Sequence, residues 1–388
     1  MMKTICVLTA TRAEYGLLLP VIRELKKCKN VNVKVAVTGT HLSPEFGMTV
    51  NEIENDGIEI DRKIDILLAS DSTAAISKTM GIAMISFADY FAESRPDALL
   101  VLGDRYETLA VCCAAMNERI PILHMCGGET TAGAVDEAVR HSISKMSYLH
   151  FTTTEAYRRR VIQLGEAPER VFWVGSTGVE NARNVKTIDK AQLEEEIGID
   201  LGEEFAVATF HPVTLENNTA KQQIEELLAA IKKYPDIKFL FTGANADVDG
   251  RLINARLVEA ANENDNVEFV NSLGLRRYMS AVKCASFVIG NSSSGVGEVP
   301  ALGIPTVNIG DRQKGRIMAD SVICCEPNTE SIVGAIDKAR SVEFKAGIDA
   351  QNNPYGKGNT SSEIARIIDE FASHDDTEIK KKFYDVEF

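Results

Sequence analysis

Acidic side chains at three points of this 388-residue chain could move a proton. Asp104 follows the apolar run Ala98–Leu102 with one glycine between, and a charge at that point is costly unless it is used or paired. Glu129 follows two glycines, which let the backbone turn tightly toward a ligand. Asp136 and Arg140 are four residues apart on one face of an expected helix, so they could bind a ligand or form an ordinary ion pair. Asp104, Glu129 and Asp136 are therefore candidate acid–base groups.

The stretch Gly290–Glu298, G-N-S-S-S-G-V-G-E, could hold a diphosphate. Backbone N–H groups and the hydroxyls of Ser292 and Ser293 suit phosphate oxygens, and a helix is expected to begin near Gly297. Glu298 could accept hydrogen bonds from the two hydroxyls of a ribose. An ordinary turn between a strand and a helix would explain the same residues, whereas a Walker A loop is excluded because no G-K-S/T follows.

Histidine and arginine side chains follow other apolar runs. His211 precedes Pro212, which fixes the local turn, and its imidazole could donate to a phosphate oxygen, although a lone histidine is more often structural. Arg12 opens an expected helix, where its planar guanidinium could reach a phosphate bidentately or simply lie on the surface. His41, in a loop bounded by glycines, could contact the ligand. Three further histidines are expected to be structural: His124, His141 and His150.

Short apolar runs alternate with helical patterns along the whole chain, which predicts parallel β-α-β units. Ligands bind at the carboxyl ends of such strands, so the motifs above are expected to converge on one cleft. The expected strands are Ile5–Leu8, Val33–Val37, Ala98–Leu102, Ile122–Met125, Leu149–Thr152, Val171–Val174, Phe205–Phe210, Phe239–Thr242, Val267–Phe269, Phe287–Ile289 and Thr306–Ile309.

The alternation occurs twice, which predicts two doubly wound, Rossmann-like α/β domains that face a cleft, as in the glycosyltransferase-B architecture. Residues 1–178 are expected to form an N-terminal domain that carries the acid–base carboxylates. Residues 179–360 are expected to form a C-terminal nucleotide-binding domain, and a helix within residues 361–388 to pack back on the first domain. A sugar nucleotide would suit the cleft, with the nucleotide on one half and the sugar facing the other.

Composition excludes several classes of function. The chain is 45% hydrophobic and 25% charged, as is ordinary for a globular protein, and its net charge of −14 argues against a nucleic-acid partner. The eight cysteines show no C-x-x-C spacing, so neither zinc nor redox chemistry is expected and we predict no metal. The sequence shows no long apolar span and no signal peptide, which predicts a cytoplasmic protein without a membrane partner.

Taken in order, these motifs resemble those of the UDP-N-acetylglucosamine 2-epimerase family, and most closely its hydrolysing branch, bacterial enzymes that feed sialic and legionaminic acid synthesis. The similarity runs nearly end to end. It is carried by T-R-A-E-Y-G, V-L-G-D-R-Y-E, G-G-E, D-E-A-V-R-H-S-I-S-K-M-S, R-R-V-I-Q-L-G-E, G-N-S-S-S-G, N-I-G-D-R-Q-K-G-R and N-P-Y-G-K-G-N. The resemblance implies a glycosyltransferase-B fold, a UDP-sugar ligand, no added cofactor, and a homodimer or homotetramer.

The resemblance also implies roles for particular residues. The acid–base carboxylates fall on Asp104 and Asp136, while a third family glutamate falls on Cys126, which cannot act as a carboxylate, so Glu129 is the candidate replacement. The phosphate and nucleotide contacts fall on Arg12, His211, Ser292, Ser293, Glu298 and Arg312. Further candidates for substrate contact are His41, Arg105, Arg140 and Asn245.

The implied reaction is hydrolytic 2-epimerisation of UDP-N-acetylglucosamine or UDP-N,N′-diacetylbacillosamine. UDP leaves, a carboxylate takes the C2 proton to give a 2-acetamidoglycal, and hydration yields the free manno sugar. A general acid must hold a proton near pH 7, so one carboxyl group is expected to have a raised pKa. The alternatives are a non-hydrolysing epimerase, a retaining glycosyltransferase and a non-catalytic sugar-nucleotide binder.

Overall fold

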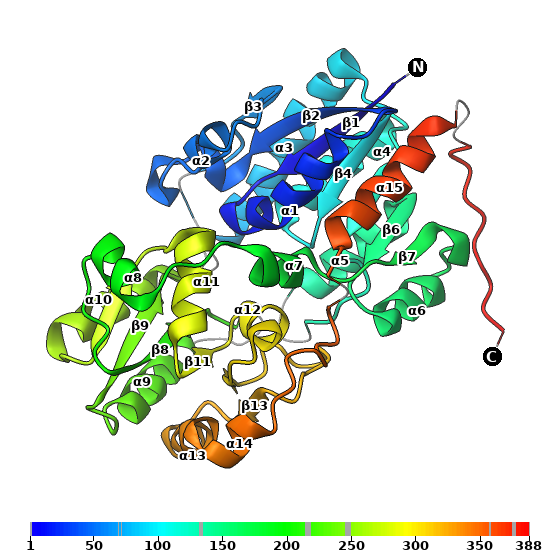
Figure 1. Ribbon diagram of the computed structural model, residues 1–388. Helices are drawn as coiled ribbons and strands as arrows, with labels where there is room; N and C mark the ends of the chain where they lie inside the picture. Colours follow the sequence, from blue (N-terminus) through cyan, green and yellow to red (C-terminus); the bar gives the residue numbers. More distant parts are fainter. Residues whose placement is uncertain are drawn as a thin grey trace. The chain divides into compact units, whose positions relative to one another are not determined.

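The computed structural model describes residues 2–68, 70, 72–131, 135–213, 219–244, 250–356, 358–374 and 378–387. The chain forms two compact units, which Figure 1 draws with the element labels used below. Unit 1 comprises residues 1–129, 136–180 and 357–388, and unit 2 comprises residues 130–135 and 181–356. The chain therefore passes between the units several times rather than once.

Unit 1 is built on a parallel sheet with the strand order β3-β2-β1-β4-β5-β6-β7. Its central strands are apolar and buried, as the A-L-L-V-L of β4 illustrates, because helices cover both faces of such a sheet. The order reverses between β1 and β4, which makes their carboxyl ends the topological switch point of the sheet. The strands are β1 (Lys3–Thr9), β2 (Val31–Thr38), β3 (Arg62–Ile64), β4 (Ala98–Leu102), β5 (Ile122–Met125), β6 (Leu149–Thr152) and β7 (Val171–Trp173).

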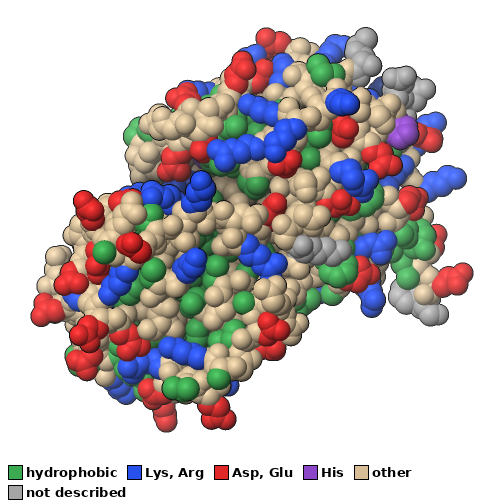
Figure 2. All heavy atoms as spheres, viewed as in Figure 1, with side chains coloured by type: hydrophobic (Ala, Val, Ile, Leu, Met, Phe, Trp, Pro, Cys, Tyr) green, Lys and Arg blue, Asp and Glu red, His purple; other side chains and the backbone are tan. Residues whose placement is uncertain are grey.

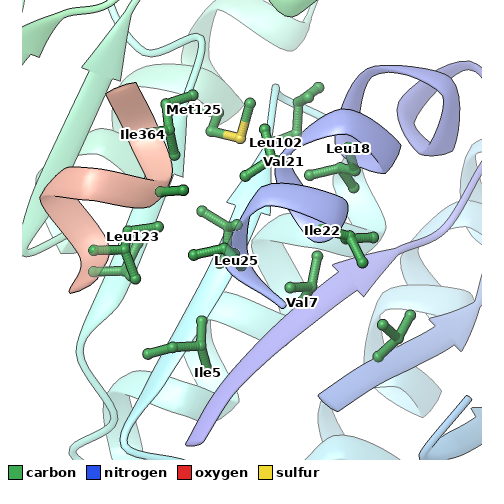
Figure 3. Close-up of a cluster of buried hydrophobic side chains, with 14 of the residues drawn as sticks. Ile5, Val7, Leu18, Val21, Ile22, Leu25, Leu102, Leu123, Met125 and Ile364 are labelled. Carbon is green, nitrogen blue, oxygen red and sulfur yellow. The ribbon is translucent and has the colours of Figure 1, made fainter. Parts of the chain in front are cut away.

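The helices of unit 1 include one from the far end of the chain. α15 (Thr360–Ser373) packs against α1 (Arg12–Leu25), and Ile364 lies in the same apolar cluster as Val21 and Leu25 (Figure 3). The other helical segments are α2 (Val50–Asn55), α3 (Thr73–Ser94), α4 (Tyr106–Asn117), α5 (Asp136–Met146), α6 (Glu155–Gln163), α7 (Thr177–Asn184), which crosses into unit 2, and the 3-10 turns η1 (Gly39–Leu42), η2 (Pro44–Phe46) and η3 (Pro168–Arg170).

The segment after α15 docks on unit 1 through a buried carboxylate. Lys381 donates from Nζ to Glu166 Oε2 over 2.7 Å, and to the backbone oxygen of Ser147 over 2.6 Å. Glu166 also accepts from Lys145 and contacts Nε2 of the buried His150. Although burial alone would raise the pKa of Glu166, these hydrogen bonds lower it to about 2. The segment is thus held by the buried carboxylate of Glu166 in the turn after α6.

Unit 2 has a parallel sheet with the order β10-β9-β8-β11-β12-β13. Its strands are β8 (Glu204–Thr209), β9 (Ile237–Thr242), β10 (Val267–Val270), β11 (Phe287–Gly290), β12 (Thr306–Ile309) and β13 (Val322–Cys325). The helical segments are α8 (Lys190–Ile197), α9 (Ala220–Ile231), α10 (Gly250–Glu263), α11 (Gly274–Cys284), α12 (Ser294–Gly297), η4 (Val299–Leu302), α13 (Thr329–Arg340) and α14 (Val342–Ala346).

The structure confirms the predicted fold class, since each unit is a doubly wound parallel α/β layer. Every strand expected from the sequence is present, and the edge strands β3 and β13 are two further strands that were not expected. The helix expected near Gly297 is a correction: α12 begins at Ser294 and ends at Gly297. In the part of the chain that the structure describes, no helix combines the length and apolarity needed to cross a membrane. Acidic and basic side chains are interspersed over the face seen in Figure 2.

Candidate active site

Asp104 and Arg140 form the centre of the site in unit 1. Gly103 turns the chain after β4 with φ 79°, and Asp104 follows it. The Arg140 side chain, which is 1% exposed, donates from Nε to Asp104 Oδ2 over 2.9 Å, and its Nη2 donates to the same oxygen. Its Nη1 donates to Glu137 Oε2 and to the backbone oxygen of Glu129, each over 2.7 Å. One buried guanidinium therefore links the end of β4, the turn after β5 and the start of α5.

The turn that carries Glu129 is held by α6 and by Thr153, which follows β6. A Cβ on Gly128, which has φ 77°, would lie 2.4 Å from the backbone oxygen of Tyr157 in α6, so only glycine fits there. Arg160 of α6 donates to the Gly128 oxygen over 2.6 Å, and Thr153 Oγ1 donates to Glu129 Oε1 over 2.9 Å. The Glu129 carboxylate is buried, and the hydrogen bond from Thr153 fixes its direction. A group that transfers a proton needs such a fixed direction.

Cys126 stands at the start of the same turn. It is half-buried, and its backbone φ is 64°, a conformation that residues other than glycine rarely adopt. Its N–H donates to the backbone oxygen of Phe151 over 2.9 Å. Glu129, three residues later, is the carboxylate residue of this turn, and its backbone oxygen accepts from Arg140.

Two buried histidines have structural hydrogen bonds. His124 Nε2 lies 2.7 Å from the Gly103 oxygen, and its Nδ1 lies 3.1 Å from Ser144 Oγ. Burial lowers the pKa of His124 to about 3, so the neutral ring donates from Nε2 and supports the turn before Asp104. His41 is fully buried between Thr9 and Thr49, with both ring nitrogens within 2.9 Å of a hydroxyl. His41, which was expected to contact a ligand, has no exposed surface in this structure, so its ligand contact stays a prediction.

A carboxyl group with a raised pKa is that of Glu14, which sequence reasoning missed. Its Oε2 accepts from the backbone N–H groups of Ala10 and Thr11 over 2.9 and 3.3 Å. Burial, followed by the charge of Glu107, raises its pKa to about 7. Among the described residues, neither Glu14 Oε1 nor Glu107 Oε2 has a hydrogen-bond partner. The sequence pattern that could have identified Glu14 is the T-x-x-E spacing of a capping box, which places this glutamate in the first turn of α1.

Arg12 and Arg105 stand at the switch point of the unit 1 sheet. Arg12 is the first residue of α1, and its Nε lies 3.1 Å from Glu52 Oε1. Arg105 precedes α4 and donates from Nε to Glu107 Oε1 over 2.7 Å. Because β1 and β4 are neighbours, the helices that follow them begin at the same edge of the sheet. Both guanidinium groups are partly exposed and could bind an anion there.

Unit 2 brings its sequence-predicted residues to the carboxyl ends of β8, β11 and β12. His211 follows β8 and is buried, and burial together with the charge of Arg312 lowers the pKa of His211 well below its ordinary value. Arg312 follows β12 and donates to the backbone oxygen of Asn291 over 3.1 Å. Ser292 and Glu298 are half-buried and Ser293 is exposed in the turn after β11.

Asn245 and Asp136 are the remaining residues for which the sequence predicted a role. Asn245, expected to contact the substrate, lies outside the described residues. Asp136 begins α5 and is half-buried, one helical turn before Arg140. Within the described residues, no group of three or more His, Cys, Asp or Glu side chains is arranged to hold a metal ion.

Comparison with known proteins places this arrangement in a family. A family model described as UDP-N-acetylglucosamine 2-epimerase matches residues 23–369. The chain is 41% identical over 344 residues to a GDP/UDP-N,N'-diacetylbacillosamine 2-epimerase (hydrolyzing) of Campylobacter jejuni, covering 88% of this chain and 89% of the relative. It is 39% identical over 386 residues to the polysialic acid biosynthesis protein P7 of Escherichia coli, covering 99% and 98%.

A solved structure shows the same fold. The UDP-GlcNAc 2-epimerase from Neisseria meningitidis, bound to UDP-GlcNAc, superposes with a TM-score of 0.80 and 22% identity, covering 95% of this chain and 99% of that one. The chain therefore belongs to the UDP-N-acetylglucosamine 2-epimerase family.

Proposed function

We propose that this protein is a hydrolysing UDP-sugar 2-epimerase, which converts a UDP-linked 2-acetamido hexose to the free manno sugar and UDP. The observation that carries the proposal is the pair of carboxylate residues, Asp104 and Glu129, that one buried arginine holds at the carboxyl edge of the unit 1 sheet. The 41% identity to a relative named as a hydrolysing 2-epimerase supports it.

The proposed chemistry needs carboxyl groups on both faces of the sugar ring. When the anomeric C–O bond breaks, positive charge develops at C1 and makes the C2 hydrogen acidic. Asp104 or Glu129 takes that proton, which gives a 2-acetamidoglycal, and Asp136 assists the addition of water at C1. A proton then returns to C2 on the opposite face, so the gluco configuration becomes manno. Cys126 cannot replace a carboxylate in either step.

The departing UDP needs its charge stabilised. In unit 2, His211, Ser292, Ser293 and Arg312 are proposed to bind the diphosphate, and Glu298 the ribose. In unit 1, Arg12 is proposed as an anion-binding group. A neutral His211 suits this role, because a ring that is not protonated still carries one N–H to donate. The acid–base work is thus proposed for residues 1–178 and the nucleotide binding for residues 179–360.

The substrate we favour is UDP-N,N′-diacetylbacillosamine, because the relative at 41% identity is named for that sugar. UDP-N-acetylglucosamine is the second candidate, named in the family description. The E. coli relative is named for polysialic acid synthesis, which supports a place in making sialic or legionaminic acid. We also propose a cytoplasmic homodimer or homotetramer that needs no added cofactor, testable by light scattering and by assay in a chelator.

Each UDP-sugar, incubated separately with the protein in heavy water and followed by NMR, tests the proposed function. The expected result is a free manno sugar carrying deuterium at C2, together with UDP, in the absence of any acceptor. A product still linked to UDP would instead indicate a non-hydrolysing epimerase. A product without deuterium at C2, or binding without turnover of either sugar, would refute the proposal. Asp104→Asn and Glu129→Gln should each abolish label incorporation, and normal turnover in both would refute the assignment of these carboxylates.

A further inference from the structure

Asn291 is a buried residue of unit 2 whose side-chain amide grips the backbone of a residue 80 positions earlier. Its Oδ1 accepts from the His211 N–H over 2.7 Å, and its Nδ2 donates to the His211 oxygen over 2.8 Å. Asn291 is 1% exposed, so water does not compete for its hydrogen bonds with His211. A single amide thus satisfies both backbone polar groups of His211.

The hydrogen bonds between the Asn291 amide and His211 begin where the pairing of β8 with β11 ends. The pairing of β8 with β11 reaches Thr209 opposite Gly290, and the Asn291 N–H donates to the Thr209 oxygen over 3.1 Å. Beyond that point Pro212 has no N–H to offer a neighbouring strand. The side chain of Asn291 therefore continues the pairing where the backbone cannot, and fixes His211 relative to β11.

The backbone oxygen of Asn291 serves a second motif. It accepts from Arg312 Nη1 over 3.1 Å and from Gln313 Nε2 over 2.9 Å, both in the turn after β12. Since β8, β11 and β12 are consecutive in the sheet, Asn291 ties together the carboxyl ends of three neighbouring strands. The Gln313 side chain is as buried as that of Asn291, so this contact is also sheltered from water.

Gly290 makes the close approach possible. Its φ is 136°, and a Cβ at this position would lie 1.9 Å from the Thr209 oxygen. Any side chain there would push β11 away from β8 and carry the Asn291 amide out of reach of His211. The Gly290–Asn291 pair at the end of β11 therefore has a specific role: the glycine allows the close approach and the asparagine bonds His211.

We infer that Asn291 is a positioning residue of the nucleotide site, which aims the His211 imidazole with its amide and the Arg312 guanidinium with its carbonyl toward the same phosphate group. This inference rests on the proposed function. It also explains why the residue is asparagine. Aspartate would set a carboxylate oxygen against the His211 carbonyl and add negative charge beside a diphosphate, whereas an aliphatic side chain would leave both His211 backbone groups without partners.

Two variants of Asn291 and one matched control test the inference. Asn291→Asp keeps the shape of the side chain, while Asn291→Ser removes the grip without adding charge. The control is Asn308→Asp in β12. Asn308 is 2% exposed, and its amide donates to the Cys324 sulfur over 3.7 Å. The measurements are the Kd for UDP by calorimetry, kcat and KM for the UDP-sugar, and Tm.

Both Asn291 variants are expected to weaken UDP binding and raise KM at least tenfold, with Asn291→Asp the weaker binder. Asn308→Asp is expected to lower Tm by a similar amount but to keep the Kd for UDP within twofold. In protein with ¹³C-labelled histidine, UDP should shift the His211 ring signal in the wild type and not in either Asn291 variant. A purely structural role for Asn291 would leave that shift unchanged.

The outcomes separate the inference from the function on which it rests. If the wild type binds UDP and turns over the UDP-sugar while both Asn291 variants keep its Kd and its His211 shift, the positioning role is wrong and the function stands. If the wild type binds no UDP, the proposed function fails and the inference falls with it. If Asn291→Asp does not fold, Asn291→Ser alone decides.

Discussion

Arg140 of α5 donates from its Nε to Asp104 at the end of β4 over 2.9 Å, with almost none of its side chain exposed. The same guanidinium also donates to the backbone oxygen of Glu129, so it sets the spacing of two residues whose carboxylates are proposed to be catalytic. Removing it would leave Asp104 and Glu137 without this partner in a partly buried setting.

Arg140→Met is expected to lower the free energy of unfolding by about 3 kcal/mol, the loss typical of breaking a buried ion pair. We expect kcat/KM to fall at least 100-fold as well, because Asp104 and Glu129 lose their common support. Urea denaturation and steady-state kinetics measure the two effects. Arg159→Met, on the exposed arginine of α6, is the control and should change neither. Retention of kcat/KM within twofold in Arg140→Met would show that the link does not matter for turnover.

Glu14→Gln is expected to remove a pH dependence of stability. The pKa of Glu14 in the folded protein, about 7, lies above its ordinary value of 4.5. The folded state therefore holds a proton that the unfolded chain releases, and the stability present below pH 4.5 is lost as the pH rises through 7. This loss amounts to about 3 kcal/mol by pH 8. Glu14→Gln should be more stable than the wild type at pH 8 and similar to it at pH 4.5.

Urea denaturation at several pH values tests the Glu14 prediction. Glu24→Gln on the same helix is the control, since Glu24 forms an ion pair with Lys27 on the surface. A wild-type stability that does not fall between pH 4.5 and pH 8, or a fall that persists unchanged in Glu14→Gln, would contradict the role given to this carboxyl group.

Thr153→Val is expected to lower kcat about tenfold without weakening UDP binding. The substitution keeps the shape of the side chain but removes the hydroxyl that donates to Glu129 Oε1, and a hydrogen bond to a charged group contributes about 1.5 kcal/mol. Thr153→Ser keeps the hydroxyl and should keep most of the activity. Equal kcat values for the valine and serine variants would argue that this contact does not orient Glu129.

The single tryptophan of the chain offers a direct measurement for the same variants. Trp173 donates from Nε1 to the backbone oxygen of Thr153 over 3.2 Å, so its emission reports on the surroundings of Glu129. Addition of the UDP-sugar should change the fluorescence of the wild type and of Thr153→Ser. An unchanged spectrum at saturating substrate in an active protein would mean that the sugar does not approach this turn.

Gly290→Ala is expected to destabilise unit 2 by about 3 kcal/mol or more, because the added Cβ would meet the Thr209 oxygen in a backbone conformation that disfavours alanine. Gly297→Ala, in the same motif, is the matched control: a Cβ there meets no atom within 4 Å, and the position is helical. We expect the control to be neutral or slightly stabilising. Thermal denaturation compares the two, and equal Tm values would contradict the close approach of β8 and β11.

Hydrophobic pattern predicted most of the fold because the central strands are buried on both faces. β4 is A-L-L-V-L, and its predicted bounds match the structure. β3 was missed because R-K-I at a sheet edge exposes its charged residues and so lacks an apolar pattern. The start of α12 was placed three residues too late, since serines and glycines carry no periodicity. Local pattern thus finds strands that contain an apolar run and misses or misplaces segments, such as β3 and α12, that lack one.

Sequence reasoning proposed candidate site residues only where a single motif suggests the chemistry. Asp104 and Glu129 became candidates because each follows an apolar run and a glycine. Their link through Arg140 could not be predicted, because it joins Arg140 to residues 36 and 11 positions earlier. The role of Asn291 could not be found from its own motif, because its partner His211 is 80 residues away. The burial of His41 could not be predicted, because its hydrogen-bond partners Thr9 and Thr49 lie 32 and 8 residues away.

The position of α15 has a consequence for how this polypeptide matures on the ribosome. Ile364, Ile367 and Ile368 belong to the apolar cluster that also contains Ile5 and Leu18, so the first unit begun by synthesis cannot close until nearly the whole chain has emerged. The second unit is almost continuous in sequence and can be finished earlier. A translation pause or a truncation before residue 360 would therefore leave the N-terminal sheet uncovered on its α15 side and open to aggregation or proteolysis.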